Sequence, residues 1–429
     1  MTRKIKDSGI EWIGQIPEDW KLVKVKDAFI RKNSKANDKD PVILSLARDG
    51  VKIRDISNNE GQLASDYSNY NPVRINDLLL NPMDLVSGDN CNIAKVEGVI
   101  SPAYFNLRYK DGVNPELYNF YFKNLYWGNV FFAHGKGVSF ENRWTLNYET
   151  LSQMMIPLPS ISEQKKIADF IINKLDKVEE IKSRITKQIQ TIEEYKKSVI
   201  TEAVTKGLDK NVEMKDSGIE WIGEIPKHWD ISKIKFLSKI LNGSTPSSNN
   251  LNFWDGEIKW ITPKDLYNNT YVEDSIKKIT KEGYLSCGTN MVPINTILLS
   301  TRAPIGTVSV AKTILCTNQG IKSIVCNKEK LNYKLLYYYL FVNESILNFL
   351  GNGTTFMELS TASLMNLELP KIPLFEQEQI VAYLDRKTAT IDEAITAKQK
   401  QLGILEEYKK SLIYEYVTGK KEVEDVGTI

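Results

Sequence analysis

Three charged residues in the second half of the chain have the types and spacing used by metal-dependent nucleases. Asp255, Glu257 and Lys259 alternate along WDGEIKW, and two carboxylates beside a lysine can hold a divalent ion and activate a water molecule. The first half has no comparable trio, and surface strands often alternate charges in the same way. An autonomous DNA nuclease is therefore kept as an alternative function and is not the main prediction.

Other signatures of chemistry are missing from the sequence. A methyltransferase would need a glycine-rich strand-to-helix turn and an N-P-P-F/Y-type pocket, but NPVR, NPMD and NPEL lack the second proline and the aromatic residue. The phosphate-binding pattern G-x-x-x-x-G-K-[ST] is absent as well. The four cysteines form no C-x-x-C pair, and two histidines are too few to complete a zinc site. We predict no catalytic residues, no metal and no cofactor in this chain.

Composition sets the broad class. A chain of 429 residues exceeds one hydrophobic core, so at least two domains are expected. No apolar run has the length of a signal peptide or membrane span, and we expect a cytoplasmic protein that contacts no membrane. The formal charge of +2 is far below that of a small basic DNA binder. Any surface that contacts phosphates must therefore come from local clusters of Lys and Arg.

The sequence is internally duplicated. KDSGIEWIGQIPEDWKLVKVK at 6–26 returns as KDSGIEWIGEIPKHWDISKIK at 215–235, with 14 of 21 positions identical. A second block ends in IEEYKKSVITEAVT at 192–205 and returns as LEEYKKSLIYEYVT at 405–418. Between these blocks the two halves retain only an outline of similarity. Two similar frames around two dissimilar inserts favour two related modules that read different targets, although faster drift of loops would also give this pattern.

Two long helices are predicted to follow the two modules. From Ser162 to about Val204 the apolar residues have helical spacing and no Pro or Gly intervenes; Ser162 is the expected N-cap and Gly207 the expected stop. The second helix repeats the pattern with Gly403 inside it. Each spans about 40 residues, or roughly 60 Å. The predicted coiled-coil contacts are Ile171, Val178, Ile185, Ile192, Val199, Leu384, Ile391, Leu405 and Leu412.

The simplest partner for each apolar stripe is the other helix, and the duplication implies a pseudo-two-fold axis, which makes the pair antiparallel. We therefore predict an α+β protein in which two mixed α/β target-recognition domains are separated by an antiparallel coiled coil. The predicted domains are 1–158 and 213–372, with helical spacers at 159–212 and 373–429. Trp12, Trp20, Trp221 and Trp229 are interpreted as core anchors in preference to base-stacking platforms.

Loops rich in small and cationic residues are suited to contact base edges and phosphates. They lie between short predicted elements, which include strands at 77–82, 296–301 and 306–312 and a helical segment at 331–351. The candidate DNA-binding residues in these loops are Arg48, Lys136, Arg143, Ser244, Thr245, Lys264, Arg302, Thr354 and Thr355.

Taken together, the repeated motifs resemble the specificity (S) subunits of type I restriction-modification systems. SGIEWIG followed by IP and W opens each half, IPLPSISEQKKIADFI and KIPLFEQEQIVAYL open the helices, and EEYKKS followed by VT closes each helix. The resemblance covers nearly the whole chain.

This resemblance implies that each module reads one half of a bipartite double-stranded DNA target and that the helices set the gap. It also implies assembly with two modification subunits, which bring S-adenosylmethionine for adenine methylation. Two motor-nuclease subunits would supply ATP hydrolysis and Mg-dependent cleavage. A recognition subunit whose single partner fuses nuclease and methyltransferase is an alternative, and a coiled-coil scaffold without a DNA role is another.

Overall fold

The computed structural model describes residues 3–36, 41–47, 50–55, 66–85, 90–137, 144–267, 269–302, 304–351 and 358–424. The chain divides into two units. The first unit contains residues 1–186 and 399–429, and the second contains residues 187–398. Each long helix therefore starts in one unit and ends in the other, and each unit is described separately.

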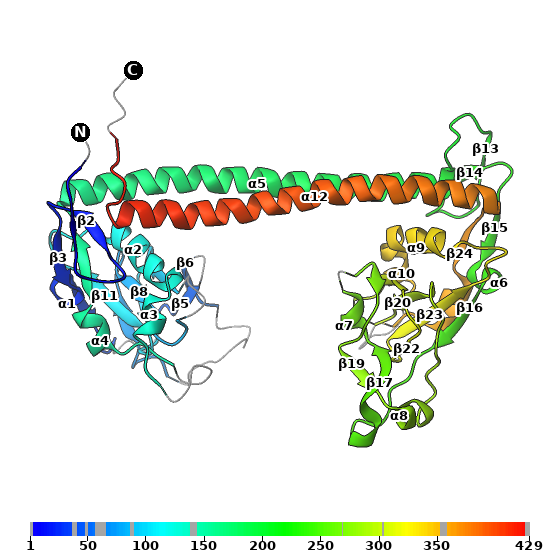
Figure 1. The fold of residues 1–429 in the computed structure, drawn as a ribbon, viewed down its shortest axis with the longest axis horizontal. Coiled ribbons are helices and arrows are strands. Elements are labelled where there is room, and N and C mark those ends of the chain that lie inside the picture. Colours follow the sequence, from blue (N-terminus) through cyan, green and yellow to red (C-terminus); the bar gives the residue numbers. More distant parts are fainter. Residues whose placement is uncertain are drawn as a thin grey trace. The chain divides into compact units, whose positions relative to one another are not determined.

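The first unit is built around a four-stranded antiparallel sheet. Its strand order is β4-β11-β8-β9, and β8 and β11 are labelled in Figure 1. Leu78, Leu80 and Leu107 on these two strands are fully buried. Helix α2 covers the sheet with a face of buried aromatic residues. The elements of this unit are β1 (Ile5–Asp7), β2 (Gln15–Pro17), β3 (Lys21–Lys24), α1 (Val25–Ala28), β4 (Phe29–Lys32), β5 (Leu44–Ala47), β6 (Gly50–Ile53), β7 (Asn71–Val73), β8 (Leu78–Leu80), β9 (Cys91–Ile93), β10 (Gly98–Ile100), β11 (Phe105–Tyr109), α2 (Pro115–Trp127), α3 (Val130–Ala133), α4 (Tyr148–Gln153) and β12 (Met155–Leu158).

The second unit repeats this core and extends it. Its main sheet has the order β16-β23-β20-β21-β18, and a separate sheet has the order β19-β17-β22. The elements are β13 (Met214–Asp216), β14 (Glu224–Pro226), β15 (Asp230–Lys233), α6 (Ile234–Leu237), β16 (Ser238–Asn242), η1 (Leu251–Phe253), β17 (Trp254–Ile261), α7 (Pro263–Leu266), β18 (Tyr271–Val272), β19 (Lys277–Ile279), α8 (Lys281–Leu285), β20 (Ile297–Ser300), β21 (Val308–Ala311), β22 (Cys316–Thr317), β23 (Ile321–Cys326), α9 (Tyr333–Val342), α10 (Glu344–Phe349), α11 (Thr361–Asn366) and β24 (Glu368–Lys371).

The predicted short elements are found close to their expected positions. Strands β8, β20 and β21 lie inside the segments predicted at 77–82, 296–301 and 306–312. The predicted helical segment at 331–351 forms two helices, α9 and α10, which are separated at Asn343. The two sheets share the order β4-β11-β8-β9 and β16-β23-β20-β21, so the duplication seen in the sequence extends to the strand order.

The two long helices, α5 (Ile161–Lys206) and α12 (Leu374–Val417), pack together and run antiparallel. In the first unit the rings of Phe170 and Tyr416 lie 4.6 Å apart, and Lys182 pairs with Glu406. In the second unit Lys196 Nζ lies 2.7 Å from Asp392 Oδ1. Higher residue numbers on α5 thus meet lower numbers on α12. Of the predicted coiled-coil residues, Ile171, Val178, Ile185, Val199, Leu384, Ile391 and Leu412 are buried, whereas Ile192 and Leu405 are half-buried.

The predicted start of the first long helix was wrong by two residues. Helix α5 begins at Ile161, and the hydroxyl of Ser160 accepts a hydrogen bond from the backbone N–H of Glu163 at 3.3 Å. The N-cap is therefore Ser160, because its hydroxyl and not that of Ser162 reaches the third N–H of the helix. The predicted stop at Gly207 is confirmed, since this residue follows the helix with φ of +74°. Helix α12 continues through Gly403.

A buried glutamine joins each long helix to the sheet-containing part of its unit. The Gln164 side chain is fully buried; its amide nitrogen donates to the carbonyls of Pro159 and Gly112, both at 2.9 Å, and its oxygen accepts from the Asn114 N–H at 2.7 Å. Gln377 repeats the arrangement with the carbonyls of Ile372 and Lys330 and the N–H of Asn332. Asn114 and Asn332 are the N-caps of α2 and α9. One amide thus fixes two helix starts in each unit.

The neighbouring glutamate and a tryptophan complete this junction. Trp20 Nε1 donates to Glu163 at 3.0 Å, and Trp229 Nε1 donates to Glu376 at 2.9 Å. Trp20 and Trp229 are buried, so the core interpretation is confirmed for them. Trp12 is half-buried and Trp221 is 39% exposed, so the interpretation was wrong for Trp221, which lies at the surface of the turn preceding β14.

Removing the buried amide from one junction should destabilise the second unit. Gln377→Ala leaves one N–H and two carbonyls without their partner, and we expect the free energy of unfolding to fall by about 2–4 kcal/mol. The matched control is Gln379→Ala, on an exposed position of the same helix, which should change the value by less than about 0.5 kcal/mol. Urea unfolding followed by tryptophan fluorescence measures both. Equal unfolding midpoints for the two variants would contradict the proposed role of the junction.

Candidate nucleic-acid interface

In the second unit, candidate residues from separate loops meet around the segment Thr317–Ile321. The backbone N–H of Ser244 donates to the carbonyl of Thr317 at 3.0 Å, and the Thr245 hydroxyl donates to the side chain of Gln319. The N–H of Thr301 donates to the carbonyl of Gly320 at 2.9 Å, which places the neighbouring Arg302 at the same turn. Candidates from two segments that are far apart in sequence, Ser244 with Thr245 and Arg302, therefore lie at the same turn.

Lys264 and Arg302 supply the exposed cations of this surface. Lys264 lies in α7, whose start is fixed by a capping box between Thr262 and Asp265, and the preceding Pro263 contacts Gly320. Arg302 donates from Nε to the Glu358 carboxylate at 3.1 Å and remains half exposed. Since Nε holds the carboxylate, the two terminal nitrogens of the guanidinium can meet an acceptor on a ligand.

The framework shapes the loop that carries Ser244 and Thr245. A Cβ at Gly243 would lie 2.1 Å from the carbonyl oxygen of Asn318 and 2.3 Å from that of Thr317, so only glycine fits here. Two indole groups hold the loop from the other side, because Trp260 donates to the carbonyl of Ser244 at 2.9 Å and Trp254 to that of Ser247 at 3.1 Å. The loop is thus positioned by the carbonyls beside Gly243 and by these two indole hydrogen bonds.

The sequence analysis missed one cation of this surface, Lys322. It lies on β23 directly after the segment just described, and its side chain is 9% exposed. Burial lowers its pKa below the ordinary value, an effect that the nearby Glu358 opposes. The available signal was weak, because a single lysine in the strand IKSIVC resembles any solvated strand position.

In the first unit, the DNA-binding candidate that lies within the described residues is Lys136. Lys136 is exposed and forms a two-way backbone bridge with Thr145. The preceding Gly135 packs against Trp144, because a Cβ at this glycine would lie 2.5 Å from the indole Nε1. The same Nε1 donates a hydrogen bond to the carbonyl of Phe132 at 2.9 Å. The remaining candidates, Arg48, Arg143, Thr354 and Thr355, lie outside the described residues.

The acidic residues that suggested a nuclease do not form a metal site in the described part of the chain. Lys259 Nζ donates to the backbone carbonyl of Glu273 at 2.6 Å, and Asp255 and Glu257 are exposed on β17 where its pairing with β19 shifts register. Among the described residues, no group of three His, Cys, Asp or Glu side chains is placed to hold a metal ion.

All four cysteines are free thiols. Burial raises the pKa of Cys91 and of Cys316 to about 12, so both remain protonated at neutral pH and are poor nucleophiles. Among the described helices, none is long and apolar enough to cross a bilayer.

Comparison with known proteins agrees with this architecture. Residues 226–402 match the family model of the type I restriction modification DNA specificity domain. The chain is 40% identical over 190 residues to the MjaIX specificity subunit of Methanocaldococcus jannaschii, covering 43% of each protein. It is 27% identical over 432 residues to the putative MjaX specificity subunit of the same organism, covering 96% of each. A chain from a structure on the complex assembly and conformational transition of a type I system superposes with a TM-score of 0.70 at 18% identity, covering 95% of this chain and 99% of that one.

Two related modules on a pair of antiparallel helices, together with the match to a DNA specificity domain, define a DNA-recognition protein. The chain belongs to the DNA specificity subunits of type I restriction-modification systems. It is a recognition subunit and not a catalytic one.

A methyl group at Gly243 should disturb the recognition loop. In Gly243→Ala the new Cβ meets two backbone carbonyls, so we expect the free energy of unfolding to fall by about 1–3 kcal/mol and sequence-specific DNA binding to weaken. Gly288→Ala is the control, because nothing lies within 4 Å of its Cβ position, and it should be neutral or stabilising by up to about 1 kcal/mol. Calorimetry and binding to the methylated motif of the host test both variants; unchanged binding by Gly243→Ala would refute the role of this loop.

Proposed function

We propose that this subunit reads a two-part DNA target, with one half read by each unit, and thereby selects the sites for adenine methylation and cleavage by its partners. The observation that supports this most directly is the repeated sheet order, which carries different loops in the two units. A shared frame keeps the presentation of loops the same, and different loops give different base contacts.

In the second unit, the proposed contacts are the loops around Thr317–Ile321. Arg302 and Lys264 are cations suited to guanine edges or phosphates, and Ser244 and Thr245 are small enough to let the backbone approach the duplex. In the first unit, the proposed contact is Lys136. Arg48, Arg143, Thr354 and Thr355 belong to the same proposal on sequence grounds alone.

The proposed recognition domains are 1–158 and 213–372, and the proposed spacers are 159–212 and 373–429. Helices α5 and α12 each start in one unit and end in the other. A change in the length of these helices therefore changes the segment that connects the two units. We therefore propose that the helices set the number of base pairs between the two halves of the target.

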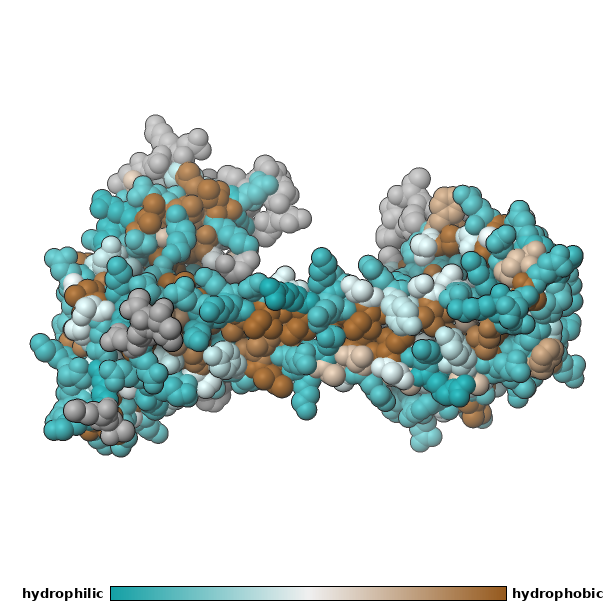
Figure 2. Space-filling view, turned by 90° about the horizontal axis from the view of Figure 1, so that it is seen from above, coloured by the Kyte–Doolittle hydropathy of each residue, from teal (hydrophilic) through white to brown (hydrophobic). Residues whose placement is uncertain are grey.

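The proposed partners are two modification subunits with S-adenosylmethionine and two motor-nuclease subunits with ATP and magnesium. The helix pair leaves apolar side chains exposed, among them Ile181 at 45% and Ile404 at 58% in the first unit, and apolar patches are visible on the helices in Figure 2. Exposed apolar patches on a folded protein are typical of surfaces that bind other proteins. The helices are therefore the proposed docking surface for these subunits.

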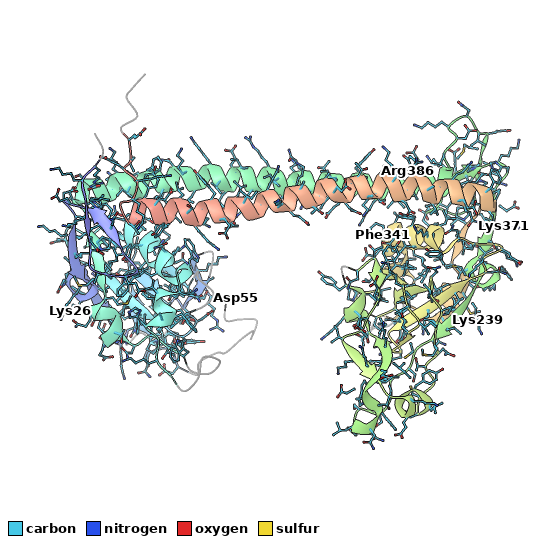
Figure 3. All side chains as sticks on the ribbon, in the orientation of Figure 1. Lys26, Asp55, Lys239, Phe341, Lys371 and Arg386 are labelled. Carbon is cyan, nitrogen blue, oxygen red and sulfur yellow. The ribbon has the colours of Figure 1, made fainter. Side chains whose placement is uncertain are left out.

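Mapping methylated adenines in host genomes with and without this gene tests the proposal. We expect a two-part motif that disappears with the gene. The double variant Lys264→Ala with Arg302→Ala should relax only one half of this motif, because both residues belong to the second unit. The control is Lys371→Ala, an exposed residue on β24 in the frame (Figure 3), which should leave the motif unchanged. Relaxation of both halves, or a motif without two parts, would refute the assignment of one half to each unit.

A further inference from the structure

Lys322 is a largely buried lysine whose ammonium group has no ion pair among the described residues. The residue is 9% exposed and lies on β23 of the main sheet of the second unit, between Asn242 of β16 and Leu299 of β20. Among the described residues, no carboxylate lies within 4 Å of its ammonium group and no acceptor takes a hydrogen bond from it. The acid that faces it, Glu358, forms its ion pair with Arg302. The group formed by these three side chains therefore keeps a net positive charge.

The fold does not require a lysine at this position. Lys322 lies two residues before Ile324, which pairs with Ile297 of β20. In the first unit, Phe105 lies two residues before Leu107, which pairs with Leu78 of β8 in the same way. Phe105 is therefore the counterpart of Lys322, and an apolar side chain satisfies the packing there. A charge at the same depth carries a desolvation cost, and the lowered pKa of Lys322 reflects that cost.

The first unit nevertheless places a cation on the same sheet face, from the adjacent strand. Arg31 of β4 lies opposite Leu107, so it shares the face of Phe105. Its guanidinium carbon lies 4.9 Å from the ring centre of Phe105 and 4.8 Å from that of Tyr148. Among the described residues, no carboxylate pairs with Arg31. Each unit thus places one cation on this sheet face that has no ion pair among the described residues, from β4 in the first unit and from β23 in the second.

An open notch surrounds Arg31, and none of the described residues that line it is acidic. It encloses about 440 Å³, and Lys26 and Lys110 lie on its rim together with Asn33 and Tyr148; Lys26 is labelled in Figure 3. The corresponding polar residues of the second unit are Asn242, at the end of β16, and Thr361, at the start of α11. The Thr361 hydroxyl donates to the Asn242 side chain at 3.0 Å. Cations beside amide and hydroxyl groups are the surroundings that a phosphate group requires.

We propose that Arg31 in the first unit and Lys322 in the second each bind a backbone phosphate of the target DNA. Both cations come from sheet strands that the two units share, whereas the loops that differ come from other segments. A cation that stands on the sheet, and not on a loop that differs between the units, is suited to a ligand group that is the same in every DNA sequence. This inference rests on DNA recognition by the family and adds to the proposed two-part reading a contact that does not depend on sequence.

The test measures the salt dependence of DNA binding by the full chain assembled with the modification subunits. Arg31→Gln and Lys322→Gln should each weaken binding to a duplex with the methylated motif and to an unrelated duplex by the same factor. The slope of log K against log salt should become shallower by about 0.9 for each variant. The controls are Lys95→Gln and Lys312→Gln, two exposed lysines that are already paired with Glu116 and Glu273; their slopes should remain unchanged.

A structural role for Lys322 is tested by Lys322→Met. Removing a buried charge should leave the unfolding temperature unchanged or raise it, while DNA binding weakens as in Lys322→Gln. A lower unfolding temperature, an unchanged slope, or a loss confined to the duplex with the motif would each overturn the phosphate assignment. If the complex without substitutions failed to prefer its motif, the proposed two-part reading would fail. The salt slopes on both duplexes would still decide whether these cations bind phosphate.

Discussion

The architecture of each unit depends on one buried side-chain amide at the start of a long helix. A glutamine removed from water has to satisfy both its donors and its acceptor inside the protein. Gln164 and Gln377 do so with two carbonyls and one N–H each. One carbonyl belongs to the residue that links the last strand of the unit to the long helix, and the other carbonyl and the N–H belong to the segment that begins α2 or α9. The direction of the long helix is thereby coupled to the orientation of the recognition module. A module with this junction keeps its orientation while its loops change.

A second constraint acts on the pairing of the helices. An apolar stripe alone permits several registers, but polar residues within the stripe specify one. Lys182 and Lys196 occupy such positions, and each reaches an acid on the other helix, Glu406 and Asp392. Lys398 donates a hydrogen bond to the side-chain oxygen of Gln188 on the other helix at 2.7 Å. A slip of the helices would separate all three pairs at once, so these contacts favour a single register even where their net energies are small.

The sequence was sufficient for the features that depend on periodicity and duplication. The spacing of Ile171, Val178 and Ile185 predicted the helix and its buried face, and the repeated blocks predicted that both units share one architecture. The helix start was misplaced because two serines two residues apart can both act as caps, and only the backbone decides between them. The grouping of Ser244, Lys264 and Arg302 could not be predicted, because it depends on strand register and on the turn at Thr317–Ile321. Lys322 was missed for the same reason, since its depth becomes evident only when β23 is placed between β16 and β20.

These observations separate two kinds of residue on the recognition modules. Loop residues such as Ser244 and Thr245 depend on close backbone approach at Gly243 and can change with the target, because the frame behind them is held by Trp254 and Trp260. Arg31 and Lys322 lie on the strands themselves, so their positions change only if the sheet does. The duplication provides an internal comparison. The two halves differ by an aromatic residue and a lysine at one strand position, and each half still has a cation on that face without an ion pair among the described residues. Packing alone does not favour a lysine at this depth. A ligand group that carries the same negative charge in every DNA sequence does favour a cation there.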